Sequence, residues 1–133
     1  MLPITGIDHI VLRVRDLDTM LTFYQGVLGC SLERQEMDLG LYQLRAGSAL
    51  IDLVSVDSPL GKLGGRPPEQ EGQNLDHFCL RIDPFDADTV KDYLLKHQVK
   101  VGEIASRYGA LGRGISIYLG DPEGNKLELK GEL

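Results

Sequence analysis

The sequence has few cysteines, no clustered basic residues and a net charge of −6 with a pI near 5.0. Cys30 and Cys79 lack CxxC spacing, and each lies in an apolar stretch, so we expect two reduced, buried thiols. No basic run exceeds two residues. Because phosphate binding depends on clustered Lys and Arg, nucleic acid is disfavoured as a partner.

Neither a leader peptide nor a membrane-spanning segment is expected from the sequence. Residues 1–9 contain neither the basic nor the apolar region of a leader peptide, and no stretch approaches about 18 apolar residues. We therefore expect a cytoplasmic protein that does not bind membranes. At 133 residues, 42% hydrophobic and 26% charged, the chain suits one compact domain, built from two half-sized modules if any repeat exists.

An internal repeat is the strongest signal in the sequence. IDHIVLRV (7–14) and LDHFCLRI (75–82) share Asp, His, Leu and Arg at the same places, and His9 and His77 are 68 residues apart. Each copy has the apolar, β-branched pattern of a buried strand, and an acidic break and a helical pattern follow it. The two halves therefore begin alike.

Each half continues with one helix and three strands. The first helix has Asp16 or Asp18 as its N-cap and Gly29 as its terminator; the second begins behind Asp86 and Asp88. Helical spacing relates the apolar residues Leu17, Met20, Leu21, Tyr24, Val27 and Leu28, and again Ala87, Val90, Tyr93 and Leu94. The predicted strands are 31–37, 39–45 and 49–56 in the first half and 100–105, 114–119 and 126–130 in the second.

The pattern thus predicts an α+β fold of two βαβββ modules, 1–56 and 75–133, within a single domain 1–133. The connecting segment 57–74 contains four glycines and three prolines, a composition typical of a surface linker. Because connections of this length inside a compact domain are often functional, a lid is the alternative.

Each half places a histidine on its first strand and a carboxylate on its last strand: His9 with Asp52, and His77 with Glu128. The two spacings are 43 and 51 residues, and the extra eight fit a longer loop at 107–114. A lone strand histidine is ordinarily a hydrogen-bonded core residue. The same placement in both halves favours metal ligation by His9 and His77 instead. His97, at the end of the second helix, has no counterpart in the other half and is not a candidate ligand.

Two neutral imidazoles with one or two carboxylates suit a divalent first-row metal such as Zn, Ni, Fe, Mn or Co, with positions left open for substrate. A structural zinc site would more often use cysteines. The sequence therefore predicts a catalytic type of metal site.

The chain resembles the vicinal oxygen chelate superfamily, which includes glyoxalase I, methylmalonyl-CoA epimerase, extradiol dioxygenases and bleomycin and fosfomycin resistance proteins. IDHIVLRVRDLDTMLTFYQGVLG, LDHFCLRI and SIYLGDPEGNKLEL carry the resemblance. It implies a cupped mixed sheet around a metal, often in a homodimer, with His9, His77 and Glu128 as ligands. Asp52 stands where glyoxalase I has a glutamate. Aspartate is one methylene shorter than glutamate, so three alternatives stay open. Asp52 binds the metal directly, binds it through a water molecule, or does not bind it.

The resemblance also suggests residues for substrate binding. Arg13 stands where glyoxalase I carries an arginine that holds a glutathione carboxylate, and Arg81 has the equivalent place in the second half. Each suits an anionic substrate or, alternatively, an ion pair with an acidic neighbour. Other glutathione contacts do not carry over, because Val56 and Gln73 occupy their positions.

These residues favour a metal-dependent lyase or isomerase of glyoxalase or epimerase type, acting on a small, anionic molecule. The metal would stabilise an enediolate or enolate as a Lewis acid, and Glu128, with Asp52 as a second candidate, would move the proton.

Three alternatives remain open. An Fe(II) or Mn(II) extradiol dioxygenase uses two histidines and one carboxylate, with Tyr108 or Tyr118 here as the nearest acid–base candidates. The others are a fosfomycin-type thiol transferase and a metal-free protein that binds a drug or metabolite.

Overall fold

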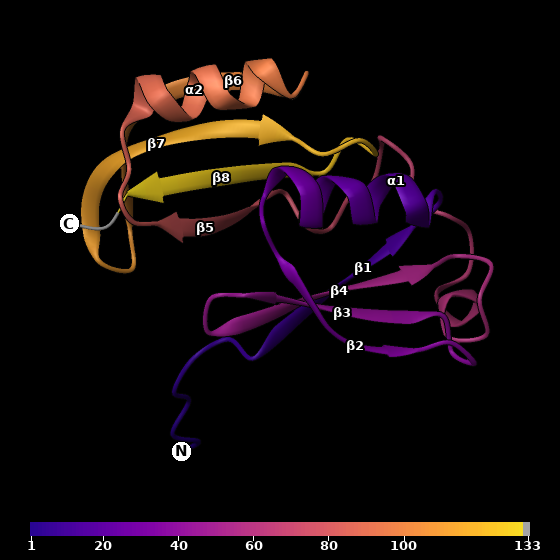
Figure 1. Ribbon diagram of the computed structural model, residues 1–133. Helices are drawn as coiled ribbons and strands as arrows, with labels where there is room; N and C mark the ends of the chain where they lie inside the picture. Colours follow the sequence, from indigo (N-terminus) through magenta and orange to yellow (C-terminus); the bar gives the residue numbers. More distant parts are fainter. Residues whose placement is uncertain (132–133) are drawn as a thin grey trace. The chain divides into compact units, whose positions relative to one another are not determined.

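The computed structural model describes residues 1–131 of the chain, which divides into two compact units, Met1–Glu69 and Gln70–Leu133. Each unit contains a four-stranded mixed sheet and one main helical segment (Figure 1). The order β-α-β-β-β occurs in both. The predicted α+β fold of two βαβββ modules is therefore confirmed.

In the first unit, β1 runs parallel to β4, and β2, β3 and β4 are antiparallel neighbours in the spatial order β1-β4-β3-β2. The strands are β1 (His9–Val14), β2 (Ser31–Glu36), β3 (Leu41–Ala46) and β4 (Ala49–Ser55). β2, β3 and β4 each end one residue from the predicted position, and β3 begins two residues later than predicted, which is the usual uncertainty for element boundaries.

Alternation along these strands separates an apolar face from a mixed face. The apolar face is buried, and its members are Leu12, Val14, Leu44, Ile51 and Leu53. Helix α1 (Leu17–Leu21) contacts β4. The mixed face carries His9, Arg13 and Asp52, so the apolar packing leaves the candidate ligands on the other side of the sheet.

The first helix begins as predicted and then changes its hydrogen-bonding pattern. Asp16 is the N-cap, and its Oδ1 accepts a hydrogen bond from the Thr19 amide at 3.1 Å. From Thr22 to Val27 the chain forms a π-helical segment instead of continuing as an α-helix. This wider turn accompanies the burial of two adjacent aromatic side chains, Phe23 and Tyr24. Gly29, at a φ of 79°, follows the segment as the predicted terminator.

The second unit repeats this plan. Its spatial strand order is β5-β8-β7-β6, with β5 parallel to β8. The strands are β5 (Phe78–Ile82), β6 (Lys100–Gly109), β7 (Gly112–Gly120) and β8 (Lys126–Gly131). Helix α2 (Ala87–Lys96) is capped by Asp86 and contacts β6 and β7. The candidate ligand Glu128 thus lies on a strand that pairs with β5 on one side and β7 on the other.

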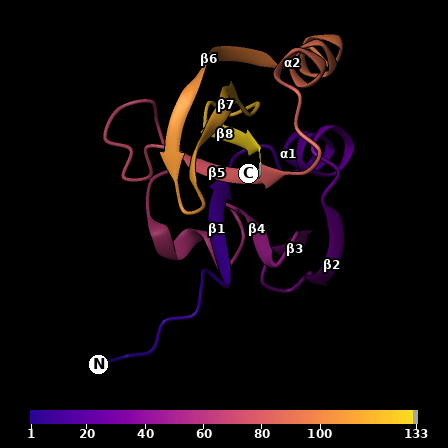
Figure 2. The ribbon, with the colours of Figure 1, turned by 90° about the vertical axis from the view of Figure 1, so that its left-hand side faces the viewer.

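The predicted loop at 107–114 is wrong. β6 and β7 form a long hairpin in which Gly109 pairs with Gly112, leaving only 110–111 as the turn (Figure 2). Gly112 has a φ of 102°, which a glycine adopts without strain. The glycines that suggested a loop therefore permit the tight turn, and the extra residues of this half lengthen two strands.

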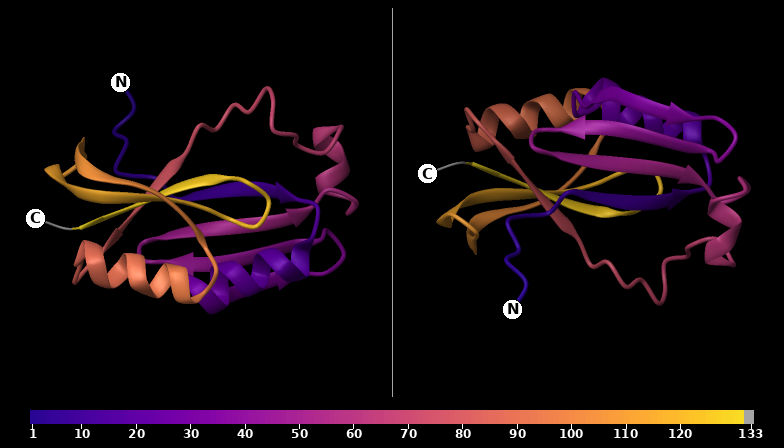
Figure 3. Two further views of the ribbon diagram at one scale, coloured as in Figure 1. Left: turned by 90° about the horizontal axis from the view of Figure 1, so that it is seen from above. Right: turned by 90° about the horizontal axis from the view of Figure 1, so that it is seen from below.

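Segment 57–74 contains a short 3-10 helix, η2 (Gly61–Gly64), beside the carboxyl ends of β1 and β4 (Figure 3). The boundary between the two units also falls within this segment. Its roles as linker or lid stay predictions. Within residues 1–131, no helix is long and apolar enough to cross a membrane.

Gly61→Ala is expected to destabilise the protein by about 1–3 kcal/mol, because a Cβ at this position would overlap the Ser55 carbonyl and crowd the Val56 Cα at 2.9 Å. Both obstacles are backbone atoms, which cannot rotate away. Urea unfolding would measure the loss. Gly26→Ala is the matched control, since a Cβ there meets nothing within 4 Å; equal stability changes in the two variants would contradict the prediction.

Candidate metal centre

His9 lies at the start of β1 with one ring nitrogen already engaged. Its Nδ1 is 2.6 Å from Asp8 Oδ1. This hydrogen bond, opposed by some desolvation and reinforced by the charge of Asp52, raises the pKa of the His9 imidazole. An Asp–His pair of this kind fixes the ring so that Nε2 is the nitrogen available to a metal. Because a metal needs the neutral ring, protons compete with it in acid.

Asp52 lies on the same face of the first sheet, where it pairs in register with Val11 on one side and Gln43 on the other. Its side chain is almost completely buried, with 2% of the residue exposed. Oδ2 accepts a hydrogen bond from Gln43 Nε2 at 3.2 Å. Oδ1 is buried and has no hydrogen-bond partner among residues 1–131. A buried carboxylate oxygen without a donor is unfavourable unless a cation offsets its charge.

His77 and Glu128 lie together in the second unit. His77 Nε2 is 3.2 Å from Glu128 Oε1. Two ligand atoms on one tetrahedral ion, each about 2.0–2.2 Å from it, are about 3.3–3.6 Å apart, close to this separation. The observed separation therefore suits joint ligation of a single cation as well as a direct hydrogen bond.

The His77 ring repeats the arrangement of His9. Its Nδ1 is 2.7 Å from Asp76 Oδ2, and the Asp76 carboxylate is also 3.6 Å from Lys126 Nζ. The hydrogen bond from His77, followed by the charge of Lys126, lowers the pKa of Asp76. The Asp–His dipeptide found twice in the sequence therefore has the same local geometry in both units, with Nε2 left for a ligand.

Tyr118 is the neighbour of Glu128 on β7, and three further side chains surround its ring. The His77 ring contacts it edge-on, with centroids 5.5 Å apart, and the Arg107 guanidinium carbon is 3.9 Å from its centroid. Lys126 Nζ is 4.6 Å from the same centroid. Tyr118 therefore belongs to the immediate surroundings of the candidate ligands, whereas Tyr108 is exposed and alternates to the opposite face of its strand.

Arg13, predicted to bind substrate, uses its guanidinium to hold the segment after β4. It donates to the carbonyls of Gly61, Gly65 and Arg66 at 2.9, 2.5 and 3.2 Å. These bonds give Arg13 a structural role, and a role in substrate binding stays a prediction.

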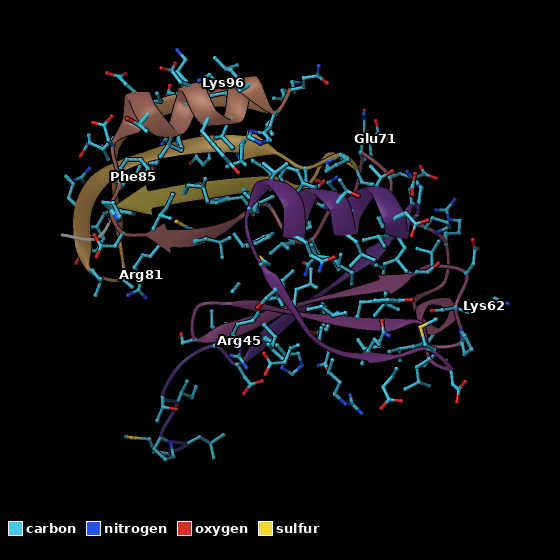
Figure 4. All side chains as sticks on the ribbon, viewed as in Figure 1. Arg45, Lys62, Glu71, Arg81, Phe85 and Lys96 are labelled. Atoms are coloured by element: carbon cyan, nitrogen blue, oxygen red, sulfur yellow. The ribbon has the colours of Figure 1, made fainter. Side chains whose placement is uncertain are left out.

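Arg81 differs from Arg13 because it lies exposed near the end of β5 (Figure 4). Lys130 on β8 is the register partner of Arg81. It is only 5% exposed, and its Nζ donates a hydrogen bond to the Gly112 carbonyl at 3.0 Å. The face of β8 around Glu128 carries alternating charged residues and is nevertheless buried at both Glu128 and Lys130. Two cationic side chains thus occupy adjacent strands just beyond Glu128.

The two thiols have different environments. Cys30 is buried as predicted, whereas Cys79 is exposed, contrary to prediction. The reason is its strand position: Cys79 alternates to the face of His77 and Glu128, opposite the apolar face. Desolvation, followed by the nearby Glu128 carboxylate, raises the pKa of the Cys79 thiol to about 11. It is therefore a neutral thiol near pH 7.

His97 is the C-cap of α2, where its Nδ1 lies 2.9 Å from the Tyr93 carbonyl oxygen. This exposed position agrees with its expected place at the helix end. Among residues 1–131, neither unit alone gathers three His, Cys, Asp or Glu side chains into one cluster. Each unit instead supplies one histidine and one carboxylate, as the sequence predicts.

Comparison with known proteins places the chain in a family. Residues 6–129 match the model of the glyoxalase/bleomycin resistance protein/dioxygenase superfamily. The virulence protein STM3117 of Salmonella typhimurium is 30% identical over 126 residues, covering 95% of this chain and 83% of that protein. Its crystal structure has a TM-score of 0.81, with 27% identity over 99% of this chain and all of that chain.

Two more proteins extend the comparison. The glyoxalase domain-containing protein RDO1 of Mycosarcoma maydis is 32% identical over 96% of this chain and 69% of its own length. The lactoylglutathione lyase of Agrobacterium tumefaciens shares the fold, with a TM-score of 0.69 and 22% identity over 97% of this chain and 95% of that chain. The superfamily model covers nearly the whole chain, including every candidate ligand. This protein therefore belongs to the glyoxalase/bleomycin resistance protein/dioxygenase superfamily.

Proposed function

We propose that the protein is a divalent-metal-dependent lyase or isomerase of glyoxalase or epimerase type that acts on a small, anionic substrate. The single observation that supports this most strongly is the buried Asp52 carboxylate, whose Oδ1 has no donor among residues 1–131. Such an atom suits a cation-binding role and is costly otherwise.

The donors fit a first-row divalent metal. His9 and His77 each have Nδ1 held by an aspartate, and Asp52 and Glu128 supply carboxylate oxygens. We propose that these four side chains bind one ion, either within one chain or between two chains of a homodimer. Zn, Ni, Fe, Mn and Co all accept this mixed set of nitrogen and oxygen ligands.

When bound, the cation would act as a Lewis acid on two neighbouring oxygens of the substrate. The chain's own residues would move the proton. Glu128 takes a proton from the carbon next to the substrate carbonyl and returns it to the adjacent or the same carbon. The Glu128 residue is only 6% exposed, so the protein around it holds the carboxylate in place for this transfer. Asp52 is the second candidate for this role.

Charge near Glu128 supports an anionic substrate. Arg81 is exposed on the strand beside the buried Lys130, and a guanidinium binds carboxylates and phosphates through paired hydrogen bonds. We propose Arg81 as the main anion-binding residue. A cytoplasmic location, where such small metabolites occur, belongs to the same proposal.

Glu128→Gln is expected to abolish exchange of substrate hydrogen with solvent, because an amide cannot accept the proton. The metal-loaded protein would be incubated in D₂O with methylglyoxal hemithioacetals and with acyl-CoA epimers, and deuterium incorporation would be measured by mass spectrometry. Glu71→Gln, in the connecting segment, is the matched control. Absence of deuterium from every such compound with the wild-type protein would contradict the proposed chemistry.

The contacts of Tyr118 favour one alternative, an Fe(II) or Mn(II) extradiol dioxygenase. Its ring lies against His77 and its strand neighbour is Glu128, so we propose Tyr118 as the acid or base of that reaction. Oxygen consumption with catechols by the iron-loaded protein would favour this reaction, and its loss in Tyr118→Phe would assign the residue.

A further inference from the structure

We infer that Gln43 is a positioning residue that makes Asp52 bind the cation through Oδ1 alone. The inference rests on the proposed metal site and adds a residue and a binding mode to it. Gln43 Nε2 donates to Asp52 Oδ2 at 3.2 Å, and the other carboxylate oxygen, Oδ1, is buried without a donor among residues 1–131. One oxygen of Asp52 is therefore held by the protein while the other is left for a ligand.

The chemistry of its partners fixes the orientation of the Gln43 amide. Arg34 Nη1 can only donate, so the Gln43 oxygen Oε1 must face it, at 3.1 Å. The Asp52 carboxylate can only accept, so Nε2 must face it. A reversed amide would put two donors together on one side and two acceptors together on the other. The amide therefore has one stable orientation.

Arg34 is held in turn by Glu36, which forms an ion pair with its Nη2. The result is a chain of contacts across three neighbouring strands, from Glu36 through Arg34 and Gln43 to Asp52. Register pairs of the sheet place these residues side by side, with Arg34 opposite Gln43 on β3 and Gln43 opposite Asp52 on β4. These contacts run from the half-buried Glu36 and the exposed Arg34 at the edge of the sheet to the buried Asp52 carboxylate.

A neutral amide suits this role better than a cation would. An arginine or lysine in place of Gln43 would neutralise the Asp52 carboxylate and weaken its attraction for a metal ion. The amide holds the carboxylate plane through one hydrogen bond and leaves the negative charge in place. It also restricts rotation of the carboxylate, so that Oδ1 keeps one direction.

The test measures Co²⁺ binding to the full chain by titration calorimetry and by the visible absorption spectrum of the bound ion. Gln43→Leu is expected to bind Co²⁺ about 10–100-fold more weakly, the range typical of residues that orient ligands, and to give an altered spectrum. The matched control is Gln35→Leu, since Gln35 is exposed and lies on the opposite face of the same sheet. This control is expected to match the wild type in affinity and spectrum.

A combined variant separates positioning from a purely structural effect. On an Asp52→Ala background, Gln43→Leu is expected to cause no further loss of affinity, because the carboxylate it orients is gone. Should Gln43→Leu fail to fold, Arg34→Leu tests the same chain from its exposed end, with a smaller loss and the same spectral change expected.

The outcomes distinguish this inference from the proposed function. Wild-type affinity and spectrum in Gln43→Leu would overturn the positioning role while leaving the metal site intact. An equal loss on the Asp52→Ala background would also overturn it. Failure of the wild-type protein to bind Co²⁺ would overturn the metal site itself, and the inference with it.

Discussion

His77→Ala is expected to weaken divalent-metal binding by more than about 100-fold, beyond the roughly 10–100-fold that changes in orienting residues cause. The substitution removes the imidazole whose Nε2 lies 3.2 Å from Glu128, and it leaves the Glu128 carboxylate without that partner. Metal content of protein purified without chelators would measure the loss. Thermal unfolding with added Zn²⁺, Ni²⁺ or Co²⁺ would provide a second reading, because a metal that binds only the folded protein stabilises it.

His97→Ala is the matched control for this experiment, because His97 is exposed at the end of α2 and its Nδ1 lies 2.9 Å from the carbonyl oxygen of Tyr93 in the same helix. It should retain the metal content and the metal-dependent stabilisation of the wild type. Equal metal content in His77→Ala and wild type would contradict the metal site and favour a metal-free binding protein, the remaining alternative from a different functional class.

The sequence repeat predicted the order of helix and strands in each unit. It did so because it marks both where the first strand of each unit begins and which of its residues share a face. The two Asp-His dipeptides mark the start of corresponding strands, and each unit indeed has a helix and three strands after that point. The sequence also predicted one histidine and one carboxylate for each half. Residues two apart on a strand share a face, so these inferences needed no knowledge of which strands are neighbours.

Contacts that depend on the register between two strands could not be predicted from the sequence alone. Gln43 shares a face of its strand with Leu41 and Arg45, which makes that face mixed, but only the pairing of β3 with β4 brings Gln43 to Asp52. A polar residue at the centre of a strand next to a buried acid is the signal that could have found it. The carbonyls that hold Arg13 have no such signal, because any residue can supply a backbone carbonyl.

The burial of Lys130 has a similar origin in packing. Its aliphatic stem lies against Gly109, and its ammonium group reaches the Gly112 carbonyl across the β6–β7 hairpin. Glycines leave space for a long side chain to lie flat along a strand pair, and the charged end still finds an acceptor. In the sequence alone, three charged residues that alternate along one strand, Lys126, Glu128 and Lys130, are typical of a solvated face.

Asp52→Leu is expected to stabilise the metal-free protein by about 1–3 kcal/mol while removing most of its stabilisation by metal. The carboxylate is 2% exposed, lies beside Val11 and between Leu50 and Val54 along its own strand, and has one oxygen without a donor within residues 1–131. Leucine removes this buried charge and extends the apolar surface already present. Urea unfolding with a chelator, and again with excess Ni²⁺, would measure both effects.

The opposite signs of the two effects make the experiment decisive. At a metal concentration of about 100 times Kd, the wild-type protein should gain roughly 2.7 kcal/mol, and Asp52→Leu much less. Asp52→Asn is the matched variant: it removes the charge but keeps a buried polar atom without a partner, so its metal-free form should gain less than that of Asp52→Leu. A metal-free Asp52→Leu protein less stable than wild type would show that the carboxylate supports the fold by itself. The predicted result would instead mean that this buried acid is retained for the cation, at the expense of stability.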